Sequence, residues 1–280
     1  MQLAIETVDR AGSREGRGPG HSARLVIGPE KAAEHSPFIV MAEDWFAPPA
    51  GFPTHPHRGI ETVTFVIEGE LMHEDHTGGR GRLGAGDVQF MTAGGGVMHS
   101  EMPGPGGVRT LQLWLNLPAR LKMTPARYKD LRCADAPVVR RDGAEARVYA
   151  GRLGEVEVPH GSIWPLTLFD LRLEPGAVFA APIPAGRRAF AYALEGKAEL
   201  AASKRAVASG EVAWMGPPPS DAELSMAAAS GARLLVMASP VIDEPIVMGG
   251  PFVMNTREEI LEAFADLRAG RLTAGKPVDV

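Results

Sequence analysis

Hydrophobic and polar residues alternate along short segments of the chain, and glycine- and proline-rich turns separate these segments. The alternation is clearest over residues 108–117, with Leu111, Leu113 and Leu115 on one face and Gln112 and Trp114 on the other. Since side chains alternate between the two faces of a strand, this pattern predicts a half-buried β-strand. Residues 62–67 and 88–91 also resemble strands, with turns expected at 68–70 and 84–87. This spacing favours a β-sandwich or β-barrel over βαβ units.

One helix is predicted near the end of the chain, over residues 257–269. Asn255 or Thr256 can cap its first turn, and Gly270 can end it. Ile260, Phe264 and other apolar residues form a stripe along one side of this helix. The expected fold class is therefore all-β with a C-terminal helix.

A weak internal repeat indicates that the β-structure is duplicated. Residues 65–71 resemble residues 192–198, and their Glu-Gly pairs are 127 positions apart. Residues 86–91 resemble 210–215 at an offset of 124. Two anchors at nearly one offset predict an N-terminal domain over 1–130 and a C-terminal domain with the terminal helix over 131–280. The linker is expected within 125–141.

Composition and charge exclude several classes of protein. Hydrophobic residues make up 45% of the chain and charged residues 22%, which is ordinary for a globular protein and excludes general disorder. The net charge is −5 and no block of Lys and Arg occurs, so direct nucleic-acid binding is not expected. No apolar stretch approaches a membrane span, and residues 1–10 lack the apolar core of a signal peptide. With Cys133 as the only cysteine, we expect a cytoplasmic protein without disulfides.

Two short motifs are candidates for metal chemistry. His55-Pro56-His57 is followed 42 residues later by His99-Ser100-Glu101. Two ligands at positions i and i+2 of a strand point to the same face, so both pairs could converge on one ion. Surface or hydrogen-bonded histidines would give the same spacings. The spacings alone therefore favour neither a metal site nor ordinary histidines.

Longer stretches around these motifs resemble the pirin family of the cupin superfamily. They are FPTHPHRGIETV at 52–63, the Glu-Gly pair at 68–69, GDVQFMTAG at 86–94, HSEMP at 99–103 and GPFVMNT at 250–256. The resemblance covers most of the chain. It implies a bicupin, in which two cupin (double-stranded β-helix or jelly-roll) barrels pack together and a helix follows.

The resemblance also implies a ligand set. It assigns His55, His57, His99 and Glu101 to one divalent transition metal, expected to be Fe(II), with Mn, Co, Ni, Cu or Zn also compatible with these donors. General cupins place a ligand Glu soon after the HxH pair, but here that position falls on Thr62. In the pirin pattern Glu101 supplies the carboxylate instead.

Other candidates are expected to lie outside this ligand set. Glu61 is interpreted as a residue beside the ligands or on the strand face. His73 and His76 are expected not to touch the metal, and His21, His35 and His160 are expected at the surface. Projection through the repeat places Pro182 and Pro184 opposite the HxH pair, and Glu223 and Ser225 opposite His99 and Glu101. The second domain is therefore expected to be free of metal, as in pirins.

The resemblance implies a quercetin 2,3-dioxygenase, an oxidoreductase that opens a flavonol ring with O₂. Glu101 would then be both a metal ligand and the acceptor of the substrate's hydroxyl proton. The expected partners are a flavonol-like small molecule and O₂, with no nucleic acid or membrane, and the chain is expected to be a monomer. Two alternatives stay open, namely a metal-dependent, redox-sensing regulator that acts through protein partners and an oxidase of another small molecule.

Overall fold

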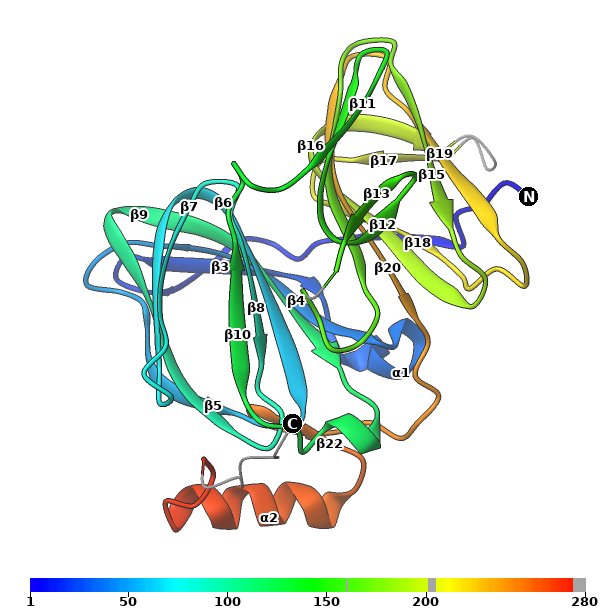
Figure 1. Ribbon diagram of the computed structural model, residues 1–280. Helices are drawn as coiled ribbons and strands as arrows, with labels where there is room; N and C mark the ends of the chain where they lie inside the picture. Colours follow the sequence, from blue (N-terminus) through cyan, green and yellow to red (C-terminus); the bar gives the residue numbers. More distant parts are fainter. Residues whose placement is uncertain (160, 201–204, 274–280) are drawn as a thin grey trace. The chain divides into compact units, whose positions relative to one another are not determined.

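The computed structural model describes residues 1–159, 161–200 and 205–273. Its residues form two compact units, each built on one extended antiparallel β-sheet (Figure 1). The N-terminal unit comprises residues 13–134 and 242–280, and the C-terminal unit comprises residues 1–12 and 135–241. The all-β class with a C-terminal helix is thus confirmed.

The N-terminal unit contains a nine-stranded sheet with the order β10-β8-β6-β9-β4-β3-β2, in which β5 also pairs with β9 and β7 with β6. Two further strands form a separate ladder beside the helix α2. The elements of this unit are β2 (Glu15–Gly18), β3 (His21–Ile27), a 3₁₀ turn (Pro29–Lys31), α1 (Ala32–His35), β4 (Phe38–Phe46), β5 (Phe52–His57), β6 (Ile60–Asp75), β7 (Arg80–Gly84), β8 (Val88–Thr92), β9 (Val97–Asn116), a 3₁₀ turn (Ala119–Leu121), β10 (Arg127–Leu131), β21 (Val247–Gly249), β22 (Phe252–Met254) and α2 (Arg257–Arg268).

The C-terminal unit contains an eleven-stranded sheet with the central order β1-β18-β16-β20-β14-β12-β11. Its elements are β1 (Thr7–Arg10), β11 (Val138–Arg141), β12 (Ala144–Leu153), β13 (Val156–Val158), β14 (Thr167–Leu173), β15 (Val178–Ile183), β16 (Arg187–Leu200), β17 (Arg205–Ala208), β18 (Glu211–Met215), β19 (Ala222–Ala227) and β20 (Ala232–Pro240).

Both ends of the chain depart from the domain ranges 1–130 and 131–280. Strand β1 pairs with β18, so the first residues belong to the C-terminal unit. Helix α2 belongs to the N-terminal unit, where Phe252, Ile260 and Ala263 share one apolar cluster. The linker is also shorter than expected, because β10 pairs with β8 and β11 pairs with β12 inside residues 125–141.

The alternation along β9 separates buried from partly exposed side chains as predicted. Leu111, Leu113 and Leu115 are buried, whereas Gln112 and Trp114 are intermediate. The turn expected at 68–70 is wrong: β6 continues through it, and its pairing with β9 shifts register there. Gly69 has φ +76°, and a Cβ on it would collide with the carbonyl of Gly107. The Glu-Gly pair therefore forms a bulge inside a long strand.

Helix α2 begins where the sequence indicates. Thr256 is the cap, its side chain accepts the Glu259 N–H at 3.2 Å, and the Glu259 carboxylate accepts the Thr256 N–H at 2.9 Å. This reciprocal capping box satisfies two N–H groups that the first turn leaves free. The choice left open between Asn255 and Thr256 is thereby settled.

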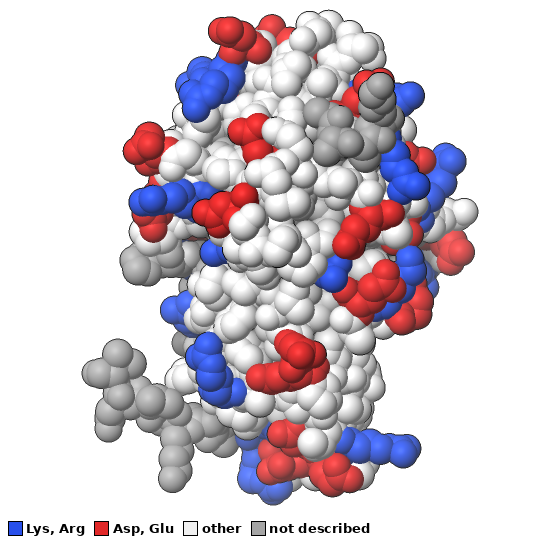
Figure 2. Space-filling model, turned by 90° about the vertical axis from the view of Figure 1, so that its right-hand side faces the viewer, with Lys and Arg blue, Asp and Glu red and all other residues white. Residues whose placement is uncertain are grey.

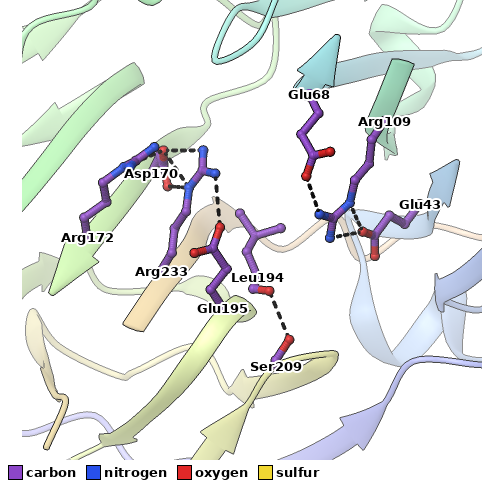
Figure 3. Close-up of polar contacts among 9 residues, drawn as sticks. All are labelled: Glu43, Glu68, Arg109, Asp170, Arg172, Leu194, Glu195, Ser209 and Arg233. Carbon is purple, nitrogen blue, oxygen red and sulfur yellow. Dashed lines mark hydrogen bonds and ion pairs between the residues drawn. The ribbon is translucent and has the colours of Figure 1, made fainter. Parts of the chain in front are cut away.

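The internal repeat is visible as two matching ion clusters, one in each unit (Figure 3). In the N-terminal unit Arg109 binds Glu43 at 2.6 Å and Glu68 at 3.0 Å. In the C-terminal unit Arg233 binds Asp170 at 2.9 Å and lies 3.7 Å from Glu195.

Each arginine is the direct register partner of the glutamate in its Glu-Gly pair, and Gly196 (φ +71°) matches Gly69. The repeat detected in the sequence therefore corresponds to the same local structure in both units, a Glu-Gly pair with an arginine opposite its glutamate.

Charged side chains of both signs are mixed on the surface. On the face drawn in Figure 2, Lys and Arg are interspersed with Asp and Glu, which agrees with the small net charge of −5. None of the helices in the described ranges is long and apolar enough to cross a membrane.

Candidate metal centre

Three neighbouring strand segments position the candidate ligands. The first residues of β9 pair with β5 on one side and with the last residues of β6 on the other. This register sets His55 directly opposite His99, and His73 directly opposite Glu101. Since His55 and His57 share one face of β5 and His99 and Glu101 share one face of β9, the HxH and HxE spacings bring these side chains together.

The imidazoles of His55, His57 and His99 form one group in which the potential ligand atoms all lie within 4.8 Å of one another. The ring centroids of His55 and His99 are 4.2 Å apart, and those of His57 and His99 are 5.2 Å apart. Glu101 falls in a second group with His99 and His73 under the same limit. His99 is common to both, so the four predicted ligands and His73 form one continuous cluster.

His73 was expected not to touch the metal, but its side chain is fully buried and its ring lies 5.3 Å from that of His99. No local sequence signal would have found it, because only the pairing of β6 with β9 sets His73 opposite Glu101.

Burial keeps the imidazoles of His57 and His99 neutral. Desolvation, reinforced by the neighbouring His55, lowers the pKa of His57 to about 3, although the Pro251 carbonyl opposes the shift. Desolvation followed by the nearby histidines also lowers the pKa of His99. Neutral imidazole is the form that binds metal ions, so these two residues are in the ligating form at neutral pH.

Glu101 is held by polar side chains of β9 and β6. The Gln112 amide donates to both carboxylate oxygens at 2.9 Å, and the Thr64 hydroxyl lies 3.4 Å from one of them. The Trp114 indole N–H is 3.4 Å from the Gln112 side-chain oxygen, which fixes which end of the amide faces Glu101. Desolvation raises the pKa of Glu101, and the Gln112 hydrogen bonds oppose that rise. The sequence placed Gln112 on this face of β9 without assigning it a role.

The donor set fits a divalent transition metal. His57 Nε2 and both ring nitrogens of His99 and His73 are buried with no hydrogen-bond partner among the described residues. Buried polar atoms are almost always paired, so such a concentration of free imidazole nitrogens calls for a ligand. Imidazole with carboxylate suits Fe, Mn, Co, Ni, Cu or Zn, and the set includes no thiolate.

The other acidic and histidine residues considered from the sequence differ in burial and in their contacts. Glu61 is buried and accepts a 2.6 Å hydrogen bond from Thr92, in keeping with a supporting place on the strand. The ring of His76 lies 3.3 Å from the Met98 N–H. The surface expectation is wrong for His35, which is 3% exposed, and for His21, whose side chain is 16% exposed. His160 lies outside the described residues.

The corresponding place in the C-terminal unit carries different side chains. Pro182 is the register partner of Glu223, and Ala180 is the partner of Ser225. The pair Pro182–Glu223 thus takes the place of His55–His99, as projection through the repeat predicts. Both residues are exposed, and Glu223 accepts a hydrogen bond from Gln2 at 2.7 Å.

A cavity of about 440 Å³ opens beside the cluster in the N-terminal unit. His55, His57 and Glu101 line one part of it, and Phe46, Phe52 and Trp114 supply aromatic walls. This volume is within the range of about 300–1,000 Å³ typical of small-molecule pockets.

Comparisons with known proteins agree with this geometry. The family model for pirin matches residues 26–115, and the model for the pirin C-terminal cupin domain matches residues 168–273. The chain belongs to the pirin family. Its all-β fold thus consists of two cupin domains, with the candidate metal centre of this pirin in the first.

Two curated relatives and one solved structure show how far the similarity extends. A Pseudomonas aeruginosa protein provisionally named as a quercetin 2,3-dioxygenase is 40% identical, covering 91% of this pirin and 93% of the relative. A pirin-like protein of Solanum lycopersicum is 36% identical, covering 92% and 89%. The crystal structure of a quercetin 2,3-dioxygenase from Acinetobacter baumannii is 31% identical with a TM-score of 0.86, covering 97% of this chain and 99% of that one.

Proposed function

We propose that this pirin-family chain is a metal-dependent oxygenase of the quercetin 2,3-dioxygenase type, which opens a flavonol-like ring with O₂. The observation that carries the proposal is the cavity of about 440 Å³, which has the candidate ligands His55, His57 and Glu101 in its wall and aromatic side chains around it. The names of the similar Pseudomonas and Acinetobacter proteins support the same reaction class.

His55, His57, His99 and Glu101 would hold the ion. A divalent ion, Fe(II) in this proposal, would supply Lewis acidity toward a substrate hydroxyl and redox chemistry toward O₂. The three imidazoles leave the carboxylate as the sole anionic ligand of the set. His73 stays beside His99 and Glu101 without being assigned to the ion.

The surrounding residues would bind and orient the substrate. Phe52 and Trp114 offer flat apolar surfaces against which an aromatic ring can stack. Glu101 would accept the hydroxyl proton, because a carboxylate held by Gln112 on both oxygens keeps its position when it gains the proton. Burial of this carboxylate excludes competing water from the proton transfer.

Oxygen uptake tests the proposal. Protein loaded with Fe(II), Mn(II), Co(II), Ni(II) or Cu(II) is mixed with quercetin, and dissolved O₂ and the flavonol absorbance are followed together. We expect stoichiometric loss of both with at least one metal, and loss of that activity in His57→Ala. Quercetin binding without O₂ uptake across all five metals would overturn the oxygenase proposal and leave regulation through protein partners as the better account.

A further inference from the structure

A histidine–aspartate pair forms part of the same cavity wall, outside the ligand cluster, and Asp44 interacts electrostatically with Glu101. His21 Nε2 lies 2.7 Å from Asp44 Oδ1, and both residues line the cavity with His55 and Glu101. The Asp44 side chain is only 9% exposed. A buried carboxylate paired with imidazole is a costly arrangement to keep in a cavity wall, which indicates a role toward a ligand.

The aspartate determines which nitrogen of the ring is free. An ionised carboxylate only accepts hydrogen bonds, so the ring nitrogen that faces Asp44, Nε2, carries a proton, and in the neutral ring the lone pair lies on Nδ1. His21 Nδ1 has no hydrogen-bond partner among the described residues and is not among their buried atoms. This nitrogen is therefore available to a molecule in the cavity.

Aromatic packing holds the His21 ring in place. Its centroid lies 5.7 Å from that of Phe46 and 5.3 Å from that of Phe52, with both contacts edge to face. Phe52 in turn lies 6.1 Å from the His55 ring. One aromatic side chain, Phe52, thus lies between His21 and the candidate metal ligand His55.

The pair also marks the end of the cavity that adjoins solvent. His21 lines a second, open groove of about 590 Å³ together with Trp45 and Arg14, and none of the candidate metal ligands lines that groove. Arg17 lines the cavity and interacts electrostatically with Asp44, so this end also carries a positive charge. A ligand that reaches from the cluster to His21 must extend past the Phe52 ring and be polar at both ends.

We propose that His21, held by Asp44, is a specificity-determining residue that binds a second acidic hydroxyl of the substrate, on the far side of Phe52 from His55. The inference rests on the proposed function, because it takes the substrate to be flavonol-like. His21 Nδ1 accepts the hydrogen bond of a phenolic hydroxyl, and Arg17 favours a phenol with partial negative charge. The substrate class is thereby narrowed to polyphenols with acidic hydroxyls at both ends.

Two flavonols test this assignment. Quercetin and 3-hydroxyflavone share the 3-hydroxy-4-keto group, but 3-hydroxyflavone lacks every other hydroxyl. Binding to metal-loaded protein is measured anaerobically by fluorescence quenching, so turnover plays no part. We expect wild type to prefer quercetin, and His21→Phe, which keeps an aromatic ring in the packing, to lose roughly 10- to 100-fold in quercetin affinity with little change for 3-hydroxyflavone.

Asp44→Asn is a second variant that preserves shape, and it should lose part of the same preference because it no longer fixes the ring proton. Ser22→Ala, beside His21 in the open groove, is the matched control and should behave as wild type. Metal content should be unchanged in all three. Equal affinity of wild type for the two flavonols, or equal losses for both in His21→Phe, would overturn the inference, whereas binding without O₂ uptake would overturn only the oxygenase proposal.

Discussion

His57 Nδ1 lies 3.3 Å from the main-chain oxygen of Pro251, a residue 194 positions later in the chain. The ring of a candidate metal ligand near the start of the chain is thus oriented by the segment that returns from the C-terminal unit. A hydrogen bond at one imidazole nitrogen directs the other toward a metal. The next residue, Arg58, also contacts the C-terminal part of the chain, through Asp266 of α2, and this contact can be tested by mutation.

Arg58 joins the ligand strand to helix α2. Its guanidinium is 3.0 Å from Asp266 and 2.7 Å from the Gly95 carbonyl, and its side chain is 5% exposed. Arg58→Met should lower the free energy of unfolding by about 1–3 kcal/mol, because it removes the hydrogen bonds of a buried guanidinium to Asp266 and to the Gly95 carbonyl. It should also weaken metal binding, since His57 is its neighbour.

Chemical denaturation and metal titration measure these two effects. Arg271→Ala is the control, because Arg271 contacts the same Asp266 but its side chain is 63% exposed. Equal effects of the two variants would show that α2 does not support the ligand strand.

Lys122 gives a pH-dependent prediction. Its buried ammonium donates to the carbonyls of Gly59 and Val253 and to the Asn116 side chain, at 2.7–3.0 Å. Desolvation lowers its pKa to about 8, against the pull of Glu244 and Glu259. Between pH 8 and the ordinary lysine value of 10.5 the unfolded chain binds more protons than the folded one, so the contribution of Lys122 to stability rises with pH in that window.

The destabilisation by Lys122→Met should therefore grow from pH 8 to pH 10. Urea unfolding of wild type and variant at several pH values measures it. A difference that is constant or shrinks with pH would contradict the lowered pKa.

The bulge glycine Gly69 should not tolerate a side chain. Its φ is +76° and a Cβ would collide with the Gly107 carbonyl, whereas Gly78 has φ +86° and nothing within 4 Å. Gly78→Ala should lower the free energy of unfolding by about 1 kcal/mol, because alanine disfavours this backbone conformation. Gly69→Ala should lower the free energy of unfolding by clearly more, because the added Cβ also meets the Gly107 carbonyl. Thermal unfolding of the two variants compares these losses. Similar melting temperatures would mean that the strand can shift away from Gly107.

Much of this fold follows from local sequence patterns. The remaining parts could not be predicted, because they are determined by pairing between segments far apart in the chain. The alternation of β9 and the cap of α2 are determined by neighbouring residues. The Glu68-Gly69 bulge was mistaken for a turn because a glycine with positive φ serves both. The assignment of β1 and α2 to units could not be predicted, since it depends on pairing partners about 200 residues away.

In the candidate metal centre, too, local patterns were predictable and long-range strand pairing was not. The HxH and HxE spacings bring their own side chains together because strand alternation is local. His21 was expected at the surface from its glycine-rich and polar neighbours, because the sequence does not give the register between β3 and β4 that brings it to Asp44. His73 was placed outside the ligand set by the family resemblance, and only the pairing of β6 with β9 brings it opposite Glu101.

Glu101 should matter more for turnover than for metal binding. Glu101→Gln removes the charge and sets an amide nitrogen against the donating Gln112 amide. We expect that variant to retain some iron and to lose roughly 10²–10⁴-fold in turnover, the range of general acid–base catalysis. Gln112→Met keeps the carboxylate and should lose less. Iron titration and O₂ consumption on one preparation decide it, and wild-type turnover in iron-loaded Glu101→Gln would leave Glu101 as a ligand only.

Metal content tests the central claim, the ligand set His55, His57, His99 and Glu101, most directly. Wild type, His57→Ala and His73→Ala are loaded anaerobically with Fe(II), dialysed exhaustively and analysed for iron per chain, with circular dichroism to confirm folding. The account predicts one ion per chain in wild type, near-complete loss in His57→Ala and retention in His73→Ala. Retention in His57→Ala together with loss in His73→Ala would contradict it and place the ion in the group of His73, His99 and Glu101.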